Sequence, residues 1–321
     1  MNNVKQAEIA PRKKRFHSAD NKGAGYYLRR DWQLYLLLLI PFVFVAVFKL
    51  APLFGLVISF KDYKIAKGFL GSDWVGLDVF KYVFSHRDFT KALRNTLLLN
   101  IMDLIGSFTV PIILALMLNE VKSMKFKRTS QTLLYLPHFI SWVIIGALAY
   151  QMFSLNSGVV NNWFESIGKE RVPFLQDNFY WLFTYVFIGI WQTMGWGTII
   201  YLAAISGINP ELYEAATVDG AGRLRKMWNI TLPCIRSTIV VLLIMNLGKI
   251  MGGSFERIFA MQNKATTEFT TTIPVLVYRW GIEGSNFSRA TALGLFQSVI
   301  GLLLVLISDQ ISKKLGENGL I

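Results

Sequence analysis

The stretch LYLLLLIPFVFVAVFKLAPLFGLVISF, residues 34–60, decides the class of fold. A helix needs about 20 mostly apolar residues to cross the hydrocarbon core of a bilayer, and this run exceeds that length. A single charged side chain, Lys49, interrupts it. Irregular or open-strand backbone cannot face lipid, because its polar groups would lack hydrogen-bond partners. The run therefore predicts a membrane-spanning helix.

Five further apolar stretches follow, at 96–118, 133–153, 179–205, 235–251 and 290–307. The one at 235–251 is the weakest, because Lys249 lies near its end and Gly252 and Gly253 follow. The 321-residue chain is 53% hydrophobic and only 17% charged, whereas soluble domains carry about 25% charged residues. We predict an all-α, polytopic membrane bundle of six helices.

The distribution of Lys and Arg predicts the orientation of the bundle. Eight basic residues precede the first span: Lys5, Arg12, Lys13, Lys14, Arg15, Lys22, Arg29 and Arg30. The short loop after the second span adds Lys122, Lys125, Lys127 and Arg128, and the tail adds Lys313 and Lys314. We expect these segments and both termini to be cytoplasmic, with 154–178 outside. The connection 61–93 should also be external, although its six Lys and Arg residues outnumber its four Asp residues.

The first span does not resemble a cleaved signal peptide. Some 30 residues precede it, the apolar run is too long, and no A-x-A-like site follows. The net charge of +13 does not indicate nucleic acid, because the basic residues cluster beside apolar segments. One cysteine and three histidines give no basis for a metal site.

The loop 206–234, which this orientation makes cytoplasmic, carries an unusual amount of helix-forming sequence. Asn209 is a good N-cap and Pro210 suits the first helical position. Asp219 and Gly220 read as a turn, and a second short helix is expected at about 221–229. Pro233 should break that helix where the next span begins. The loop could dock into a partner's groove through Leu212, Tyr213, Leu224, Met227 and Trp228, or simply pack on its own bundle.

A motif in this loop resembles the EAA signature of permease subunits of binding-protein-dependent ABC importers. Its members are Glu214, Ala215, Ala216, Asp219, Gly220, Ile230, Leu232 and Pro233, with every spacing matched. Further stretches, including QTLLYLPHFISW at 131–142, resemble the oligosaccharide-uptake branch related to the maltose permeases. Within that branch the chain is most similar to a subgroup that imports complex, often uronate-containing saccharides such as alginate.

The resemblance implies a domain organisation and a set of partners. Residues 1–30 would be a basic tail, 31–315 the permease domain and 316–321 a cytoplasmic tail. The partners would be a second, similar permease in a heterodimer, two ATP-binding subunits, a solute-binding protein, the oligosaccharide and membrane lipid. The chain has no G-x-x-x-x-G-K-[ST] run. ATP and Mg²⁺ would therefore belong to the partner ATPases, with no cofactor in this chain, which would not itself be an enzyme.

Polar and aromatic residues within the spans are candidates for the substrate path, because charges at membrane depth are costly. We single out Gln192, Trp196, Lys249 and Asp103, each with a plain packing or snorkelling alternative. His138, after Pro137, indicates a helix kink rather than a proton relay. The segment after the fifth span should be an outer loop that meets the binding protein or the substrate through Glu256, Arg257, Tyr278, Arg279 and Trp280.

Three other functions compete with the importer interpretation. An ion-coupled secondary transporter should have paired broken helices and ion ligands at mid-membrane, and only Asp103 hints at that. A membrane enzyme would need a cluster of His, Asp or Glu, which the sequence does not offer. A structural scaffold would leave the polar residues of the spans unexplained. Co-purification of an ATPase and a second permease would indicate the importer, whereas a secondary transporter should purify alone.

Overall fold

The computed structural model describes residues 24–316 and 319. It consists of helices with one two-residue strand pair, which confirms the all-α class. The basic residues from Lys5 to Lys22 lie outside the described residues. The chain divides into two compact units, residues 1–55 and 56–321, which are treated separately.

The first unit is helical in its described part except at Asp31, where the chain bends. The short helix α1 (Ala24–Arg30) is followed by α2 (Trp32–Val45), η1 (Ala46–Leu50) and the start of η2 (Ala51–Phe60). The α2 helix has no buried residue and is apolar on all sides. Pro52 has no N–H to donate, and the helix passes from a π-turn at Ala46–Leu50 to 3-10 geometry there. The run Trp32–Phe60 is long and apolar enough to cross a membrane, as predicted for 34–60.

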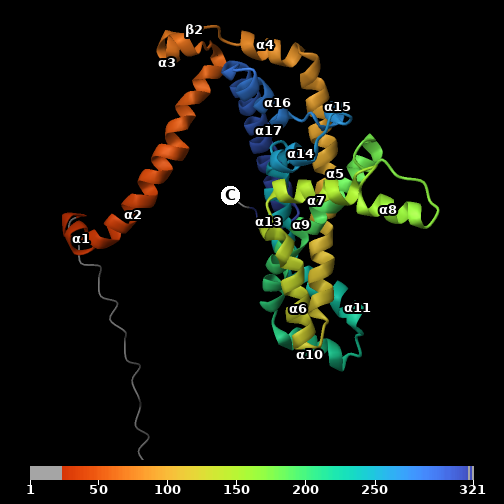
Figure 1. Ribbon diagram of the computed structural model, residues 1–321. Coiled ribbons are helices and arrows are strands. Elements are labelled where there is room, and N and C mark those ends of the chain that lie inside the picture. The colour runs from red at the N-terminus through yellow and green to blue at the C-terminus, as the bar shows by residue number, and fades with distance from the viewer. Residues whose placement is uncertain (1–23, 317–318, 320–321) are drawn as a thin grey trace, which may run out of the picture. The chain divides into compact units, whose positions relative to one another are not determined.

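The second unit begins with a small extramembrane segment. A strand pair, β1 (Lys61–Asp62) and β2 (Asp73–Trp74), encloses η3 (Ile65–Lys67) and α3 (Gly68–Gly71), and α4 (Asp78–Ser85) follows. The Lys67 ammonium lies 2.6 Å from the Asp73 carboxylate, and this hydrogen bond lowers the pKa of Asp73. Figure 1 shows α4 at one end of the bundle and α10 at the other. We refer to these as the α4 end and the α10 end.

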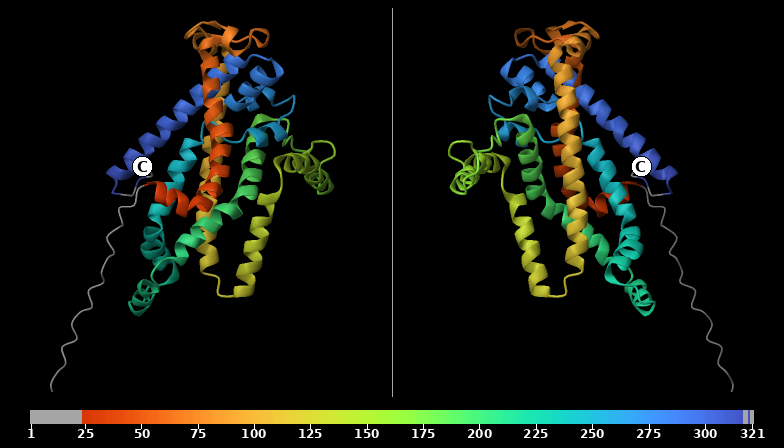
Figure 2. Two further views of the ribbon diagram at one scale, coloured as in Figure 1. Left: turned by 90° about the vertical axis from the view of Figure 1, so that its left-hand side faces the viewer. Right: turned by 90° about the vertical axis from the view of Figure 1, so that its right-hand side faces the viewer.

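Three long helices form the frame of the second unit: α5 (Arg87–Asn119), α9 (Asn178–Ser206) and α17 (Phe287–Lys314). The α5 and α9 helices pack closely, because Gly197 faces the Pro111 ring and Thr198 donates to the Pro111 carbonyl. The α13 helix (Arg236–Gly248) packs on α17. Figure 2 shows α17 slanting away from α5 toward the α10 end.

The stretch predicted as one span at 133–153 is two helices. The pair α6 (Met124–Tyr135) and η4 (Leu136–Phe139) is bent by 101° from α7 (Trp142–Phe153). The chain leaves the helix at Ile140, and Ser141 caps α7 by accepting from the Ile144 N–H. The kink expected at Pro137 and His138 is therefore present, and it is a sharp break between two helices rather than a mild bend within one. Within the described residues, the spans number six only if this pair and a second bent pair, Arg223–Cys234 and Arg236–Gly248 at 61°, are each counted as one.

Short helices complete the second unit. The α8 helix (Val159–Ser166) follows α7 in the chain and packs on it, and α14 (Phe255–Met261) also packs on α7. The α15 (Thr267–Thr270), α16 (Ile273–Tyr278) and η6 (Arg279–Glu283) elements then lead to α17. Figure 1 shows α15 and α16 toward the α4 end. The predicted outer loop is therefore an ordered helical segment.

Candidate functional site

The loop at the α10 end begins with a well-capped helix, α10 (Pro210–Val218). The Asn209 side-chain oxygen accepts from the Glu211 N–H at 3.1 Å. Pro210 occupies a first-turn position, where its missing N–H is not needed. Glu211 places negative charge at the positive end of the helix dipole. The sequence thus specifies the start of this helix by local chemistry, as predicted.

A tight corner terminates α10 at Gly220. The Ala221 N–H donates to the Ala216 carbonyl at 2.8 Å, and the Gly220 N–H donates to the Thr217 carbonyl at 3.1 Å. These two bonds form a Schellman motif, in which the residue after the cap adopts a left-handed conformation. Gly220 has φ of +74° with open space around its Cα. Backbone conformation, rather than crowding, therefore requires glycine at this position.

A second helix leaves the corner and is bonded back to α10. It comprises α11 (Arg223–Lys226), η5 (Met227–Thr231) and α12 (Leu232–Cys234). The Tyr213 hydroxyl lies 2.9 Å from the Thr231 hydroxyl, which is buried. The Lys226 ammonium donates to the Thr217 hydroxyl at 2.6 Å. These contacts join the two helices into one rigid piece.

The second helix extends beyond its expected end near residue 229, and the break expected where the fifth span begins is present. The helix continues to Cys234 and bends by 61° before α13. Just before Pro233 the ladder widens to a π-turn, in which the Leu232 N–H donates to the Met227 carbonyl. The wider turn leaves room in the ladder for a residue without an N–H. The break therefore falls at Ile235.

One face of the two loop helices is apolar and open. Leu212, Val218, Leu224 and Trp228 are between 45% and 89% exposed, and Glu214 and Ala215 are exposed beside them. The opposite face is fixed to the bundle, because Met227, Leu232 and the buried Ile235 pack in one apolar cluster. Tyr213 and Met227, two of the predicted anchors, thus face inward. Val218, which we did not predict, is the most exposed apolar residue of the loop.

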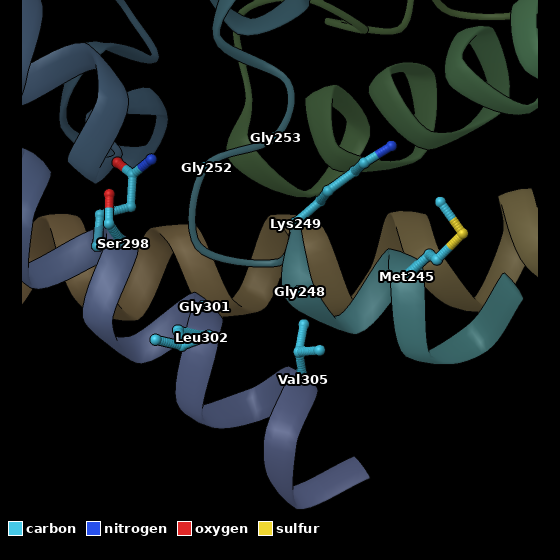
Figure 3. A pocket seen from close by; sticks show the side chains of 10 residues that line it. Met245, Gly248, Lys249, Gly252, Gly253, Ser298, Gly301, Leu302 and Val305 are labelled. Carbon is cyan, nitrogen blue, oxygen red and sulfur yellow. The ribbon is translucent and has the colours of Figure 1, made fainter. Parts of the chain in front are cut away.

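A pocket of about 540 Å³ lies where α13 ends against α17. Figure 3 shows Lys249 at the end of α13, with Gly252 and Gly253 in the loop that follows and Ser298, Gly301 and Val305 on α17. A Cβ at Gly248 would overlap Val305, and one at Gly301 would overlap the Gly248 carbonyl, so these glycines let α13 and α17 approach closely. Lys249 is exposed and has no polar partner among the described residues. Asn100 stabilises the chain just after the end of α13 by donating to the Ile250 carbonyl at 2.8 Å.

Asp103 is held by a buried arginine. The Nη2 atom of Arg257 lies 2.9 Å from Oδ1 of Asp103, and the Arg257 side chain is 3% exposed. The guanidinium stacks 3.8 Å from the centre of the Tyr185 ring. The expectation that Arg257 lies on an outer loop surface was therefore wrong. Helix α14 turns back among the spans and buries this side chain against α5 and α9.

The other two substrate-path candidates are close together on α9. Gln192 is buried, and its Nε2 donates to the His138 carbonyl at 3.3 Å. Trp196 is 51% exposed and stacks on the His138 ring with 4.9 Å between the ring centres. Both residues therefore stabilise the bend between η4 and α7 through their contacts with His138. Lys249 lines the pocket of Figure 3, and neither Gln192 nor Trp196 is part of that lining.

The fold and the loop define a helical membrane protein with an appendage at one end that exposes apolar side chains. Residues 107–317 match the family described as binding-protein-dependent transport system inner membrane component. The chain belongs to this family, the permeases of ABC importers, which confirms that prediction and sets aside the secondary transporter, the membrane enzyme and the scaffold. Membership also places the chain in the inner membrane.

Individual relatives match over most of their length. Protein LplB of Bacillus subtilis (strain 168) is 44% identical, over 91% of this chain and 92% of that protein. The polygalacturonan/rhamnogalacturonan transport system permease protein YteP of the same organism is 43% identical, over 89% of each. A chain from the bacterial alginate ABC transporter, solved in complex with alginate pentasaccharide-bound periplasmic protein, is 39% identical with a TM-score of 0.85. That match covers 93% of this chain and all (100%) of the other.

Proposed function

We propose that this chain is the permease for an acidic oligosaccharide, driven by ATP hydrolysis on separate subunits. The relatives that support this carry polygalacturonan, rhamnogalacturonan or alginate in their names. Each of these polymers contains uronate residues, so a shared requirement for carboxylated sugars fits all of them.

The observation that carries the mechanism is the exposed apolar face of the loop helices at the α10 end. Leu212, Val218, Leu224 and Trp228 project from a piece whose own geometry is fixed by the Gly220 corner and the Tyr213–Thr231 contact. Such a face suits a groove in an ATP-binding subunit. Closure of the ATPases would move this rigid piece and switch the bundle between inward-facing and outward-facing states.

Glu214, Ala215 and Ala216 would lie in the groove, with Glu214 near a cationic or polar group of the ATPase. Asp219 and Gly220 would keep the corner, and Ile230, Leu232 and Pro233 would connect it to the spans. ATP and Mg²⁺ would be bound by the two partner ATPases. The α10 end and both termini would be cytoplasmic, with domain limits at about 30 and 315.

The remaining partners follow from the same assignment. A second, similar permease would complete the pathway as a heterodimer, and a solute-binding protein would deliver the sugar at the α4 end. Lys249, free in the pocket of Figure 3, is our candidate for the sugar carboxylate within the membrane. Trp196 would offer an aromatic face, whereas Gln192 and Asp103 would act through the contacts that fix the helices around them.

Uptake in proteoliposomes tests the proposal. The complete importer, with its solute-binding protein, should take up oligogalacturonate or oligoalginate and leave neutral oligosaccharides of equal length outside. Uptake should stop when ATP inside is replaced by a non-hydrolysable analogue. Equal uptake of neutral and acidic sugars would overturn the substrate class, and uptake without ATP hydrolysis would overturn the driving force.

A further inference from the structure

A second hollow lies at the α4 end, away from the pocket of Figure 3. It has a volume of about 380 Å³ and forms between the start of α5 and the α15–η6 segment. Its polar lining includes Asp88, Lys91, Glu268 and Arg279, and Trp280 supplies an aromatic wall. Pockets for small molecules typically measure about 300–1,000 Å³. The hollow is therefore large enough for part of a saccharide.

Arg279 is the cation of this hollow that no carboxylate neutralises. Its Nη1 donates to the Thr271 hydroxyl at 2.9 Å, and its Nη2 donates to the Gln262 side-chain oxygen at 3.3 Å. Both partners are neutral, and no carboxylate of the described residues is within ion-pair distance of Arg279. The two bonds hold the guanidinium in place and leave three of its five N–H donors for a ligand.

One of the two acidic residues of the hollow is paired with a cation, and the other lies at a helix N-terminus. Glu268 lies 2.9 Å from the Lys91 ammonium, and this hydrogen bond lowers the pKa of Glu268. Asp88 occupies the first turn of α5, where the helix dipole favours negative charge. Both carboxylates remain acceptors for hydroxyl donors. The lining therefore combines one free cation with acceptors, a pattern that suits a ligand with both a carboxylate and hydroxyl groups.

The orientation of Trp280 adds an apolar surface. Its ring meets the His86 ring edge-to-face, with 5.3 Å between the centres. This contact restrains the indole from one side. The apolar C–H face of a pyranose ring packs well against an aromatic face of this kind.

We propose that this hollow is an outer subsite for one uronate residue, with Arg279 binding the carboxylate, Asp88 and Glu268 accepting from hydroxyls, and Trp280 packing against the ring. The proposal rests on the proposed function, which supplies an acidic saccharide and places the α4 end outside. The subsite would receive the leading sugar before it reaches the spans. A docked acidic side chain of the solute-binding protein is the competing occupant, but it would leave the hydroxyl acceptors unused.

Direct binding tests the subsite without the solute-binding protein. Trigalacturonate is titrated calorimetrically into the assembled importer in nanodiscs, in a Lys249→Gln background so that the other pocket contributes little. Loss of a charge-assisted, two-point contact should weaken binding by about tenfold or more in Arg279→Gln. Arg279→Lys should restore part of the affinity. Arg289→Gln is the matched control, because Arg289 stacks on Tyr82 outside the hollow.

The outcomes separate this proposal from the function on which it rests. Unchanged trigalacturonate binding in Arg279→Gln, while the wild-type importer still takes up the sugar, would overturn the subsite alone. Arg279→Gln that weakens only the affinity for the solute-binding protein would assign the hollow to that protein and also overturn it. Equal weakening for maltotriose would show that the carboxylate is not recognised. Absence of uronate uptake by the wild-type importer would instead overturn the proposed substrate.

Discussion

The Arg257 guanidinium lies between Asp103 and the Tyr185 ring, 2.9 Å from the Asp103 carboxylate, with only 3% of its side chain exposed. The ion pair joins the short helix α14 to α5, two elements far apart in the chain. Two of its donors, Nε and Nη2, have no aligned acceptor, so the contact is an ion pair rather than a linear hydrogen bond. Removal of the partner of a charge buried in this way strongly destabilises a protein, because the remaining charge is left uncompensated.

Removal of either partner should destabilise the bundle. Arg257→Met leaves the Asp103 carboxylate without its counter-ion, and breaking a buried pair typically costs about 3–5 kcal/mol. Unfolding of the detergent-solubilised importer should therefore occur at a clearly lower temperature. The double variant Asp103→Leu/Arg257→Met should recover part of the loss. If the single variant melts like the wild type, the pair contributes nothing to stability.

Substitution of Gly189 should destabilise the protein nearly as much, because a Cβ there would overlap Nη1 of Arg257. Gly189→Ala should cost about 1–3 kcal/mol by overpacking, measured by the same thermal unfolding. The cost should shrink in an Arg257→Met background, because the two sites share one contact. Gly294→Ala is the control, since Gly294 faces open space in α17. An equal loss of stability in both backgrounds would show that Gly189 does not act through its contact with Arg257.

The corner at Gly220 should be essential for transport and nearly irrelevant to folding of the spans. Proline requires φ near −65° and cannot adopt the +74° of Gly220, so Gly220→Pro should abolish uptake while the protein remains in the membrane. Glu214→Lys should do the same by reversing charge at the proposed contact with the ATPase. Gly222→Ala should have no effect, because Gly222 has φ of −68° and free space. Normal uptake in Gly220→Pro would contradict the coupling role.

The bond between the loop helices predicts a graded effect. Tyr213→Phe removes the hydroxyl that lies 2.9 Å from the buried Thr231 hydroxyl. The loss should cost about 1 kcal/mol and loosen the two helices, so that more ATP is hydrolysed for each sugar imported. Tyr150→Phe is the control, since Tyr150 is 62% exposed and far along the chain from the loop. An unchanged ratio of hydrolysis to uptake in Tyr213→Phe would show that the bond is not needed for coupling.

The sequence alone determined the class of fold and the corner of the loop. A long apolar run such as 34–60 admits a helix and little else in lipid. The Asn209 cap and the left-handed glycine at position 220 act on bonds within a few residues of themselves. For the same reason the loop motif, which is local, could be recognised without any structure.

The tertiary structure decided what depends on partners distant in sequence. The break between η4 and α7 leaves the His138 carbonyl to accept from Gln192 on another helix. Arg257 is buried because Asp103, Tyr185 and Gly189 meet around it, although its neighbours in sequence resemble those of an exposed loop residue. The position of Pro233 in a continuing helix depends on a π-turn that has no simple sequence signal. Burial and charge pairing are properties of assembled helices, so residue types and spacing alone could not assign these roles.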